Sequence, residues 1–170
     1  MSDALTRFFR NPVIPVVVID DAGLAVPLAE ALLAGGISAI EITLRTKQAL
    51  AALEAIAKDV PDMLLTAGTA LNAAHLQQVK DAGASLAVSP GISVELLEAS
   101  KTLGLTLLPG IATASELMLG LHHGLTHFKL FPASAINGIG LAKAFAGPFP
   151  EARFCCTGGI SEAELPLYLN

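Results

Sequence analysis

The first candidate for a catalytic residue is a lysine within an apolar run. Lys129 lies between Phe128 and Leu130. If the run is a strand, its two-residue period puts Lys129 and Phe131 on one face. Lysine is seldom buried without a partner or a task, and burial disfavours the charged ammonium. Because a neutral amine forms an imine with a ketone, the run predicts an imine-forming lysine. The alternative is a lysine that extends to solvent from an edge strand.

Three polar residues at a two-residue spacing form the second candidate group. In a strand, Glu41, Thr43 and Arg45 share one face. A carboxylate on an inward face suits a general acid–base that moves protons through a water molecule. An arginine at a strand end suits a clamp for a substrate carboxylate. The alternative is a structural ion pair between Glu41 and Arg45.

Two short glycine-containing segments complete the candidates. Thr69 ends the small-residue segment 67–69, and its hydroxyl and backbone could meet a substrate carboxylate. Thr157, Gly158 and Gly159 follow another apolar run. Glycine lets backbone N–H groups approach an anion such as phosphate closely. Each segment taken alone is also compatible with an ordinary turn.

Apolar runs of strand length contain or precede all of these residues. Successive runs start 19 to 26 residues apart, which leaves room for a strand, a loop, a helix and a second loop. The seven runs are 13–19, 39–44, 63–69, 86–90, 105–111, 126–132 and 152–157. Helical patterns with start or stop signals, such as the capping box of Thr113 and Glu116, occur between them. The predicted helices are 23–34, 48–58, 72–82, 93–103 and 113–124.

Strict alternation of strands and helices implies a parallel sheet with right-handed crossovers. Near-equal repeats and polar strand ends favour an α/β fold, a (β/α)8 TIM barrel, over a doubly wound sheet, which would need a change of strand order. In such a barrel, functional residues lie at the carboxyl ends of the strands. Only seven strands are visible, and an open barrel would leave two bare sheet edges. We therefore expect residues 1–170 to be a single barrel domain, C-terminally incomplete, with the eighth strand and helix missing.

The composition limits the classes of function. The chain of 170 residues is 53% hydrophobic and 15% charged, which is typical of a large folded core. A net charge of −5 and only ten lysines and arginines leave no clustered basic surface for nucleic acid. No segment has the pattern of a membrane span or a signal peptide. We therefore expect neither a nucleic-acid nor a membrane partner.

Histidines and cysteines are weaker candidates. His122, His123 and His127 could suggest a metal site, but no inward carboxylate or cysteine completes a ligand set with them. Cys155 and Cys156 are neighbours without a triad partner and make a poor disulfide framework. We expect no metal, two cysteines that pack within a strand, and a reducing, cytoplasmic location.

Eight short motifs, taken in order, carry a resemblance to a known family. The chain resembles the class I aldolase of the Entner–Doudoroff pathway, 2-keto-3-deoxy-6-phosphogluconate (KDPG) aldolase, a family also described as 4-hydroxy-2-oxoglutarate aldolase. The motifs are Pro-Val-Ile-Pro-Val at 12–16, Glu-Ile-Thr-Leu-Arg-Thr at 41–46, Ala-Gly-Thr at 67–69, Ser-Pro-Gly at 89–91, Leu-Pro-Gly-Ile at 108–111, Ser-Glu-Leu-Met-Leu-Gly at 115–120, Phe-Lys-Leu-Phe-Pro-Ala at 128–133 and Thr-Gly-Gly-Ile at 157–160.

The resemblance implies a reaction, an assembly and residue roles. The family cleaves KDPG to pyruvate and glyceraldehyde 3-phosphate, and also 4-hydroxy-2-oxoglutarate to pyruvate and glyoxylate. Its members are barrels, usually homotrimers, and need no metal or cofactor. By position, Lys129 matches the Schiff-base lysine and Glu41 the general acid–base residue. The residues matched to substrate binding are Arg45 and Thr69 for the pyruvate carboxylate, Pro109 and Phe131 for the pocket lining, and Thr157, Gly158 and Gly159 for the phosphate side.

Other functions stay open at this point. The related 2-dehydro-3-deoxy-6-phosphogalactonate aldolase is similar at the lysine strand but usually lacks an arginine at the position of Arg45. A non-catalytic barrel that binds a phosphorylated ligand would keep Gly158 and Gly159 without needing Lys129. A metal-dependent aldolase would need inward ligands besides Glu41. The family also completes its phosphate site with a loop after strand eight, so the imine half of the prediction rests on more residues than the phosphate half.

Overall fold

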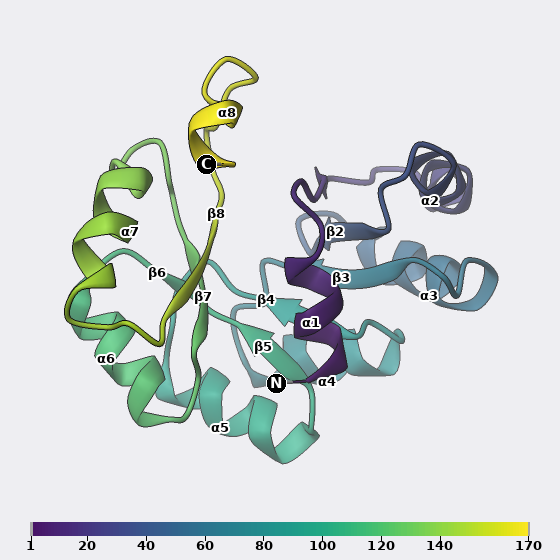
Figure 1. Ribbon diagram of the computed structural model, residues 1–170. Helices are drawn as coiled ribbons and strands as arrows, with labels where there is room; N and C mark the ends of the chain where they lie inside the picture. Colours follow the sequence, from purple (N-terminus) through teal and green to yellow (C-terminus); the bar gives the residue numbers. More distant parts are fainter. Residues whose placement is uncertain (1, 170) are drawn as a thin grey trace. The chain divides into compact units, whose positions relative to one another are not determined.

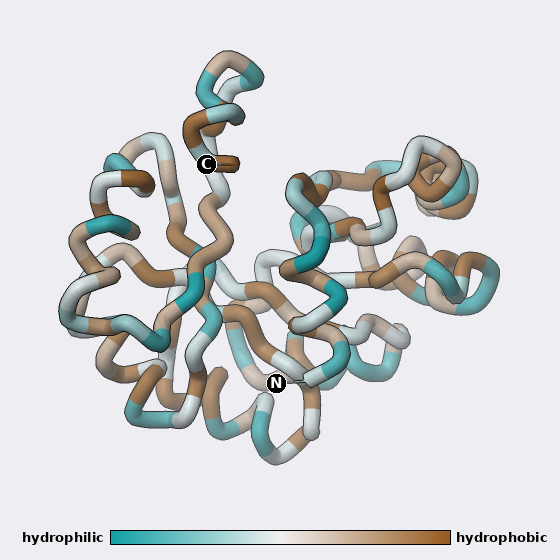
Figure 2. The backbone as a smooth tube through the Cα atoms, in the orientation of Figure 1, coloured by the Kyte–Doolittle hydropathy of each residue, from teal (hydrophilic) through white to brown (hydrophobic). Residues whose placement is uncertain are grey.

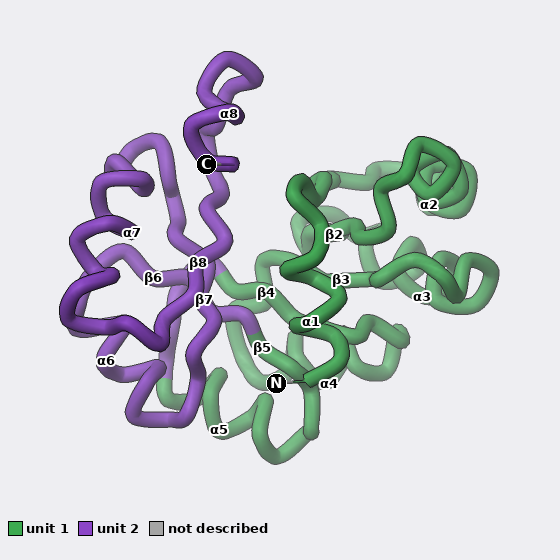
Figure 3. The backbone as a smooth tube through the Cα atoms, viewed as in Figure 1, with its two compact units in different colours: residues 1–89, 94–107 green, residues 90–93, 108–170 purple. Residues whose placement is uncertain are grey.

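The structure is a computed structural model that describes residues 2–169 (Figure 1). The chain divides into two compact units (Figure 3). Unit 1 extends to Ser89 and includes Val94–Leu107. Unit 2 contains Pro90–Ser93 and the chain from Leu108 onward.

A sheet in the order β1-β2-β3-β4-β5 forms the centre of unit 1. Its strands are β1 (Val16–Val17), β2 (Ala39–Thr43), β3 (Leu64–Gly68), β4 (Leu86–Val88) and β5 (Thr106–Leu108). The pairs β1–β2, β2–β3 and β3–β4 are parallel. Every residue of β2 and β3 is buried, as expected for parallel strands covered on both faces. The register places Glu41 opposite Thr66 and Thr43 opposite Gly68.

Helices alternate with these strands along unit 1. They are α1 (Asp3–Phe9), the 3-10 helix η1 (Ala22–Leu24), α2 (Ala25–Ala34), α3 (Ala49–Asp59), α4 (Ala73–Asp81) and α5 (Val94–Leu103). Each of α3 and α4 buries an apolar stripe, such as Leu53 and Ile56 of α3. The Asn72 side chain accepts a hydrogen bond of 2.9 Å from the His75 N–H and so caps α4. The helices therefore cover the sheet with apolar faces and keep polar faces outward.

A three-stranded sheet in the order β6-β7-β8 forms the centre of unit 2. Its strands are β6 (Gly110–Ile111), β7 (His127–Leu130) and β8 (Arg153–Cys156), all parallel. The helices are α6 (Ala114–His122), α7 (Gly138–Ala146) and α8 (Leu165–Tyr168). The predicted capping box of α6 is confirmed, because the Thr113 N–H donates to the Glu116 carboxylate at 2.8 Å and the Thr113 hydroxyl accepts from the Glu116 N–H.

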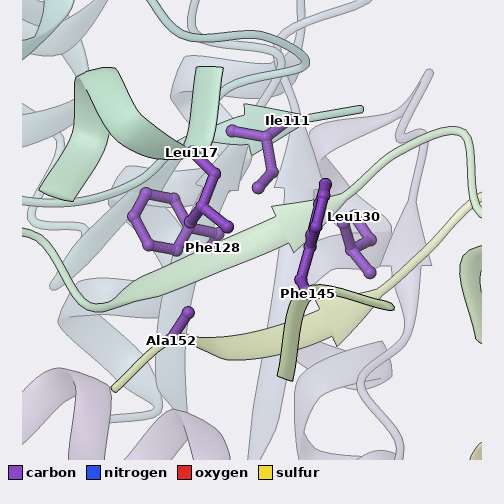
Figure 4. Packing of buried hydrophobic residues seen from close by; sticks show 6 residues of the cluster. All are labelled: Ile111, Leu117, Phe128, Leu130, Phe145 and Ala152. Carbon is purple, nitrogen blue, oxygen red and sulfur yellow. The ribbon is translucent and has the colours of Figure 1, made fainter. Parts of the chain in front are cut away.

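Phe128 of β7 is the centre of the unit 2 core (Figure 4). The ring is fully buried, and burial of such a side chain stabilises a fold by about 1.5–3 kcal/mol. Helix α6 approaches the ring at Gly120, where an added Cβ would lie 2.8 Å from the Phe128 Cζ. The other members of this core are Ile111, Leu117, Leu130, Phe145 and Ala152. The face of β7 that carries Phe128 is thus a packing face.

The seven predicted strands are confirmed in position, although β1 is shorter than expected. The predicted strand 105–111 is divided into β5 and β6 at Pro109, which has no N–H for a sheet. Figure 2 shows hydrophobic colour along β5. The five predicted helices are confirmed as η1 with α2, and as α3 to α6, whereas α1 and α7 were not predicted. Within residues 2–169, none of the helices combines the length and hydropathy of a bilayer span.

The prediction that residues 1–170 form one domain stays a prediction. It names the terminal residues 1 and 170, which lie outside the described residues. The short helix α8 follows β8, which is the last of the seven predicted strands.

Candidate active site

Lys129 lies on the middle strand of the unit 2 sheet. Its register partners are Gly110 on β6 and Cys155 on β8. The side chain is 7% exposed. The alternative of a lysine extending from an edge strand is therefore wrong. Lys129 is therefore a buried amine on a central strand, the position predicted for an imine-forming lysine.

Two predicted pocket residues lie next to Lys129. The Lys129 Nζ lies 5.0 Å from the centroid of the Phe131 ring, within the range of a cation–π interaction. The predicted common face of Lys129 and Phe131 agrees with this contact. Directly before β6, the Pro109 carbonyl accepts a hydrogen bond of 2.9 Å from the Lys129 N–H. The ring thus offers its electron-rich face to a positively charged nitrogen, whether ammonium or iminium.

Two backbone hydrogen bonds join the loop after β8 to the loop after β7. The Ala133 N–H donates to the Thr157 carbonyl at 2.8 Å, and the Ser134 N–H donates to the Gly158 carbonyl at 3.0 Å. Gly158 and Gly159 have φ angles of +101° and +76°, which favour glycine. A Cβ at Gly158 would lie 3.1 Å from the Phe131 Cδ2. Unit 2 therefore brings Lys129, Phe131, Pro109 and the segment Thr157–Gly159 into one region.

Glu41 lies buried in β2 of unit 1, with 4% of its side chain exposed. The hydroxyls on its face of the sheet donate to backbone carbonyls, that of Thr43 to Val17 at 3.1 Å and that of Thr66 to Ile40 at 2.9 Å. The Glu41 carboxyl group lies over Gly68, where an added Cβ would be 2.8 Å from the Glu41 Cδ. A buried carboxylate placed at the end of β3 can accept a proton from a bound ligand.

Thr69 and Arg45 follow the carboxyl ends of β3 and β2. Thr69 has a φ of +65°, which is unusual for a β-branched residue. Such strain costs about 1–3 kcal/mol and is concentrated at functional sites. Arg45 is exposed. Both positions fit contacts to a ligand at this edge of the sheet.

The histidines and cysteines do not form a further site. His122 and His123 lie at the end of α6, and the His127 Nδ1 lies 2.9 Å from the Thr126 hydroxyl at the start of β7. In the part of the chain that the structure describes, no cluster of three or more potential metal ligands occurs. Burial raises the pKa of the Cys156 thiol, so this half-buried residue is a poor nucleophile at neutral pH.

Sequence reasoning missed two features of the site. Gly68 leaves the space that the Glu41 carboxyl group occupies, and this depends on strand register rather than on local pattern. The left-handed backbone of Thr69 has no local signal either, because threonine is not a residue that favours it.

The parallel sheets of both units and the buried Lys129 of unit 2 are typical of one class of protein, a parallel α/β enzyme of the imine-forming type. Comparisons with known proteins make the class specific. The chain matches the family model "Aldolase: KDPG and KHG aldolase" over residues 5–170. The 2-dehydro-3-deoxy-phosphogluconate aldolase of Pseudoalteromonas atlantica is 52% identical over 163 residues, which are 96% of this chain and 76% of that protein. The chain belongs to the KDPG and KHG aldolase family.

Solved structures agree with this assignment. KDPG aldolase from Legionella pneumophila, with pyruvate captured at low pH as a covalent carbinolamine intermediate, has a TM-score of 0.94 and 47% identity. The match covers 99% of this chain and 82% of that one. The Zymomonas mobilis ZM4 enzyme with 3-phosphoglycerate has a TM-score of 0.92 and 45% identity, covering 98% and 79%. These matches confirm the predicted family and the predicted α/β barrel class of fold.

Proposed function

We propose that this protein is a class I aldolase that cleaves KDPG to pyruvate and glyceraldehyde 3-phosphate, with Lys129 as the covalent catalyst. The observation that carries the proposal is the burial of Lys129 on the central strand β7, in a chain of this family. A phosphorylated keto acid and pyruvate are then its small-molecule partners.

The first half of the reaction forms an iminium. The Lys129 amine attacks the C2 carbonyl carbon of the substrate, and the carbinolamine that results loses water. The Phe131 ring, 5.0 Å from the Nζ, favours the positive charge that the nitrogen then carries. The carbinolamine in the Legionella relative supports this route by analogy.

The second half breaks the C3–C4 bond. Glu41 removes the C4 hydroxyl proton, directly or through a water molecule, and glyceraldehyde 3-phosphate leaves. The bond electrons move to the iminium and give an enamine. A proton from Glu41 returns to C3, and water then hydrolyses the iminium to pyruvate and the free lysine amine. The iminium is the electron sink, so no step requires a metal or a cofactor.

Substrate orientation is assigned to the strand ends. Arg45 and the Thr69 hydroxyl hold the carboxylate of the pyruvate half, and Pro109 and Phe131 line the pocket around the imine. Thr157 and the N–H groups of Gly158 and Gly159 bind phosphate. This role fits the position of the three residues after β8 and the left-handed backbone of the two glycines. The 3-phosphoglycerate in the structure of the Zymomonas relative is a three-carbon phosphate, like the glyceraldehyde 3-phosphate of the proposed reaction.

A second substrate is favoured by the family description, which names KHG beside KDPG. Cleavage of 4-hydroxy-2-oxoglutarate to pyruvate and glyoxylate uses the same imine chemistry and needs no phosphate contact. The phosphogalactonate epimer differs only at C4, and the presence of Arg45 argues for KDPG over it. A homotrimer and a cytoplasmic location also remain part of this proposal, the latter supported by the two free cysteines.

Trapping with borohydride tests the proposal. The protein is incubated with pyruvate, reduced, digested and analysed by mass spectrometry. We expect a reduced pyruvate adduct on Lys129, none in Lys129→Arg, and an undiminished adduct in Lys143→Ala, because Lys143 is exposed on α7. Absence of the adduct from Lys129 would refute the proposed function.

A further inference from the structure

Gly68 faces the side chain that the proposed reaction uses as its base. An ideal Cβ built at Gly68 would lie 2.8 Å from the Glu41 Cδ and 2.9 Å from its Cγ, and closer still to its Oε1. Real Cβ atoms do not approach other atoms so closely. The carboxyl group therefore occupies the volume in which any other residue at position 68 would place its side chain.

The register explains why this glycine meets Glu41. Glu41 is opposite Thr66, and Gly68 lies two residues further along β3 on the same face. The Glu41 side chain thus leans along the sheet toward the carboxyl ends of the strands, where ligands of parallel α/β proteins bind. The Cβ of any other residue at position 68 would clash with the Glu41 side chain in this conformation.

The backbone of Gly68 does not require glycine. Its φ lies outside the left-handed region, unlike that of six other glycines in the described chain. It also ends a regular strand, in register with Thr43, and its carbonyl accepts a hydrogen bond of 2.9 Å from the Leu44 N–H. An alanine could adopt this conformation, and alanine in a strand is ordinarily no worse than glycine. The space over the residue is the constraint.

We propose that Gly68 is a positioning residue, which sets the place of the Glu41 carboxylate for proton transfer by leaving that volume empty. The proposal rests on the proposed function, since it assigns Glu41 to the proton steps. The hydroxyls of Thr43 and Thr66, on the same face of the sheet, donate to backbone carbonyls. The space over Gly68 is a determinant of where the carboxylate lies within unit 1.

Gly68→Ala separates positioning from folding. The atoms that must yield all belong to the Glu41 side chain rather than to backbone, so we expect the fold to persist while the carboxylate moves. A misplacement of about 1 Å can cost on the order of 10²-fold in rate. We expect a loss of that order in kcat, a much smaller change in KM, and unchanged trapping of pyruvate on Lys129, because the iminium that borohydride reduces forms before the proton transfers at C4 and C3 that are assigned to Glu41.

The matched control is Gly147→Ala. Gly147 follows α7 with a φ of −69°, and an added Cβ there meets nothing within 4 Å. We expect wild-type kcat for this variant. A second readout is exchange of the pyruvate methyl protons with solvent, followed by NMR, because it needs the imine and the base but no aldehyde. Gly68→Ala is expected to slow this exchange as much as it slows cleavage.

A double-mutant cycle with Glu41→Gln decides the outcome. If Gly68 acts through the carboxylate, Gly68→Ala adds little once the carboxylate is gone. The proposal is overturned by wild-type turnover in Gly68→Ala, or by an equal loss in the wild-type and Glu41→Gln backgrounds. If Gly68→Ala does not fold, the shorter side chain of Glu41→Asp is expected to restore folding, and failure in that background also overturns the proposal. Lack of trapping on Lys129 in the wild type would instead refute the proposed function.

Discussion

Replacing Thr69 with glycine is expected to make the protein more stable and less active. The left-handed φ of +65° costs a β-branched residue roughly 2 kcal/mol, within the usual range of about 1–3 kcal/mol. The added backbone freedom of glycine in the unfolded chain lowers the free energy of unfolding by about 0.5–1 kcal/mol. Loss of two half-buried carbons, the Cβ and the methyl, lowers the stability by roughly 0.8 kcal/mol, half the value for full burial. The net gain is about 0.5 kcal/mol, or about 1–2 °C in Tm for a chain of this size.

Two companion variants make the Thr69→Gly result interpretable. Thr69→Ala also removes the hydroxyl but keeps a Cβ at positive φ, so we expect no comparable gain in stability. Thr126→Gly alters an exposed threonine whose φ is not positive, and we expect a loss of about 0.5–1 kcal/mol. Urea unfolding measures all three. A fall in the stability of Thr69→Gly similar to that of Thr126→Gly would refute the assignment of strain.

The activity of the same variants tests the role of the Thr69 hydroxyl. A hydrogen bond to a charged carboxylate contributes about 1.5–3 kcal/mol, so both Thr69 variants are expected to bind pyruvate at least about tenfold more weakly. Thr69→Ser keeps a hydroxyl and is expected to retain most of the affinity. Pyruvate binding is measured as the concentration dependence of borohydride trapping. Equal affinity of the Thr69→Gly variant and the wild-type protein would exclude this contact.

Three further predictions concern other residues. Glu41→Gln preserves the size of the side chain and is expected to lower kcat by about 10²–10⁴-fold with trapping retained, so near-wild-type turnover contradicts the acid–base role. Gly158→Ala combines a φ of +101° with a close approach to Phe131 and is expected to cost about 1–3 kcal/mol in urea unfolding. It is also expected to raise KM for KDPG more than for 4-hydroxy-2-oxoglutarate, and an equal rise would argue against a phosphate role. Burial, with the charge of Arg153, lowers the pKa of His127 in the folded protein. As the pH falls below about 6.5, the unfolded chain therefore binds a proton at His127 before the folded protein does, and the free energy of unfolding decreases. The His127→Gln variant is expected to lose less of its free energy of unfolding than the wild type between pH 8 and pH 5.5. An unchanged difference between the two pH values would exclude His127 as a contributor.

The strands of this protein were predictable because they carry local signals. Each is a short apolar run bounded by polar residues or glycine, and burial on both faces of β2 and β3 explains why the runs are almost uninterrupted. The division at Pro109 follows from the missing N–H, and the sequence showed the proline without showing that it would end one strand and precede another. Register and pairing depend on residues far apart in the chain, so they came only from the structure.

Helix α7 shows why one repeat was missed. Its sequence begins with Gly138 and contains Gly140, and each glycine weakens a helix by about 1 kcal/mol relative to alanine. Tertiary contacts compensate for this: Phe145 is buried, and its ring centroid lies 6.0 Å from that of Phe154 on β8. Asn137, at a φ of +51°, caps the first turn through its side chain. Local propensity therefore argued against a helix that packing makes stable.

The candidate site divides along the same line. Lys129 can be recognised from the local sequence, because a lysine between two buried apolar neighbours is rare in any strand. The space for the Glu41 carboxylate is created by a residue that is distant in sequence and has no side chain, and it can be recognised only when β2 and β3 are aligned. The sequence can therefore name the groups that react. Their geometry also depends on residues such as Gly68, whose contribution is volume left empty, and a search restricted to chemically reactive side chains will pass over them.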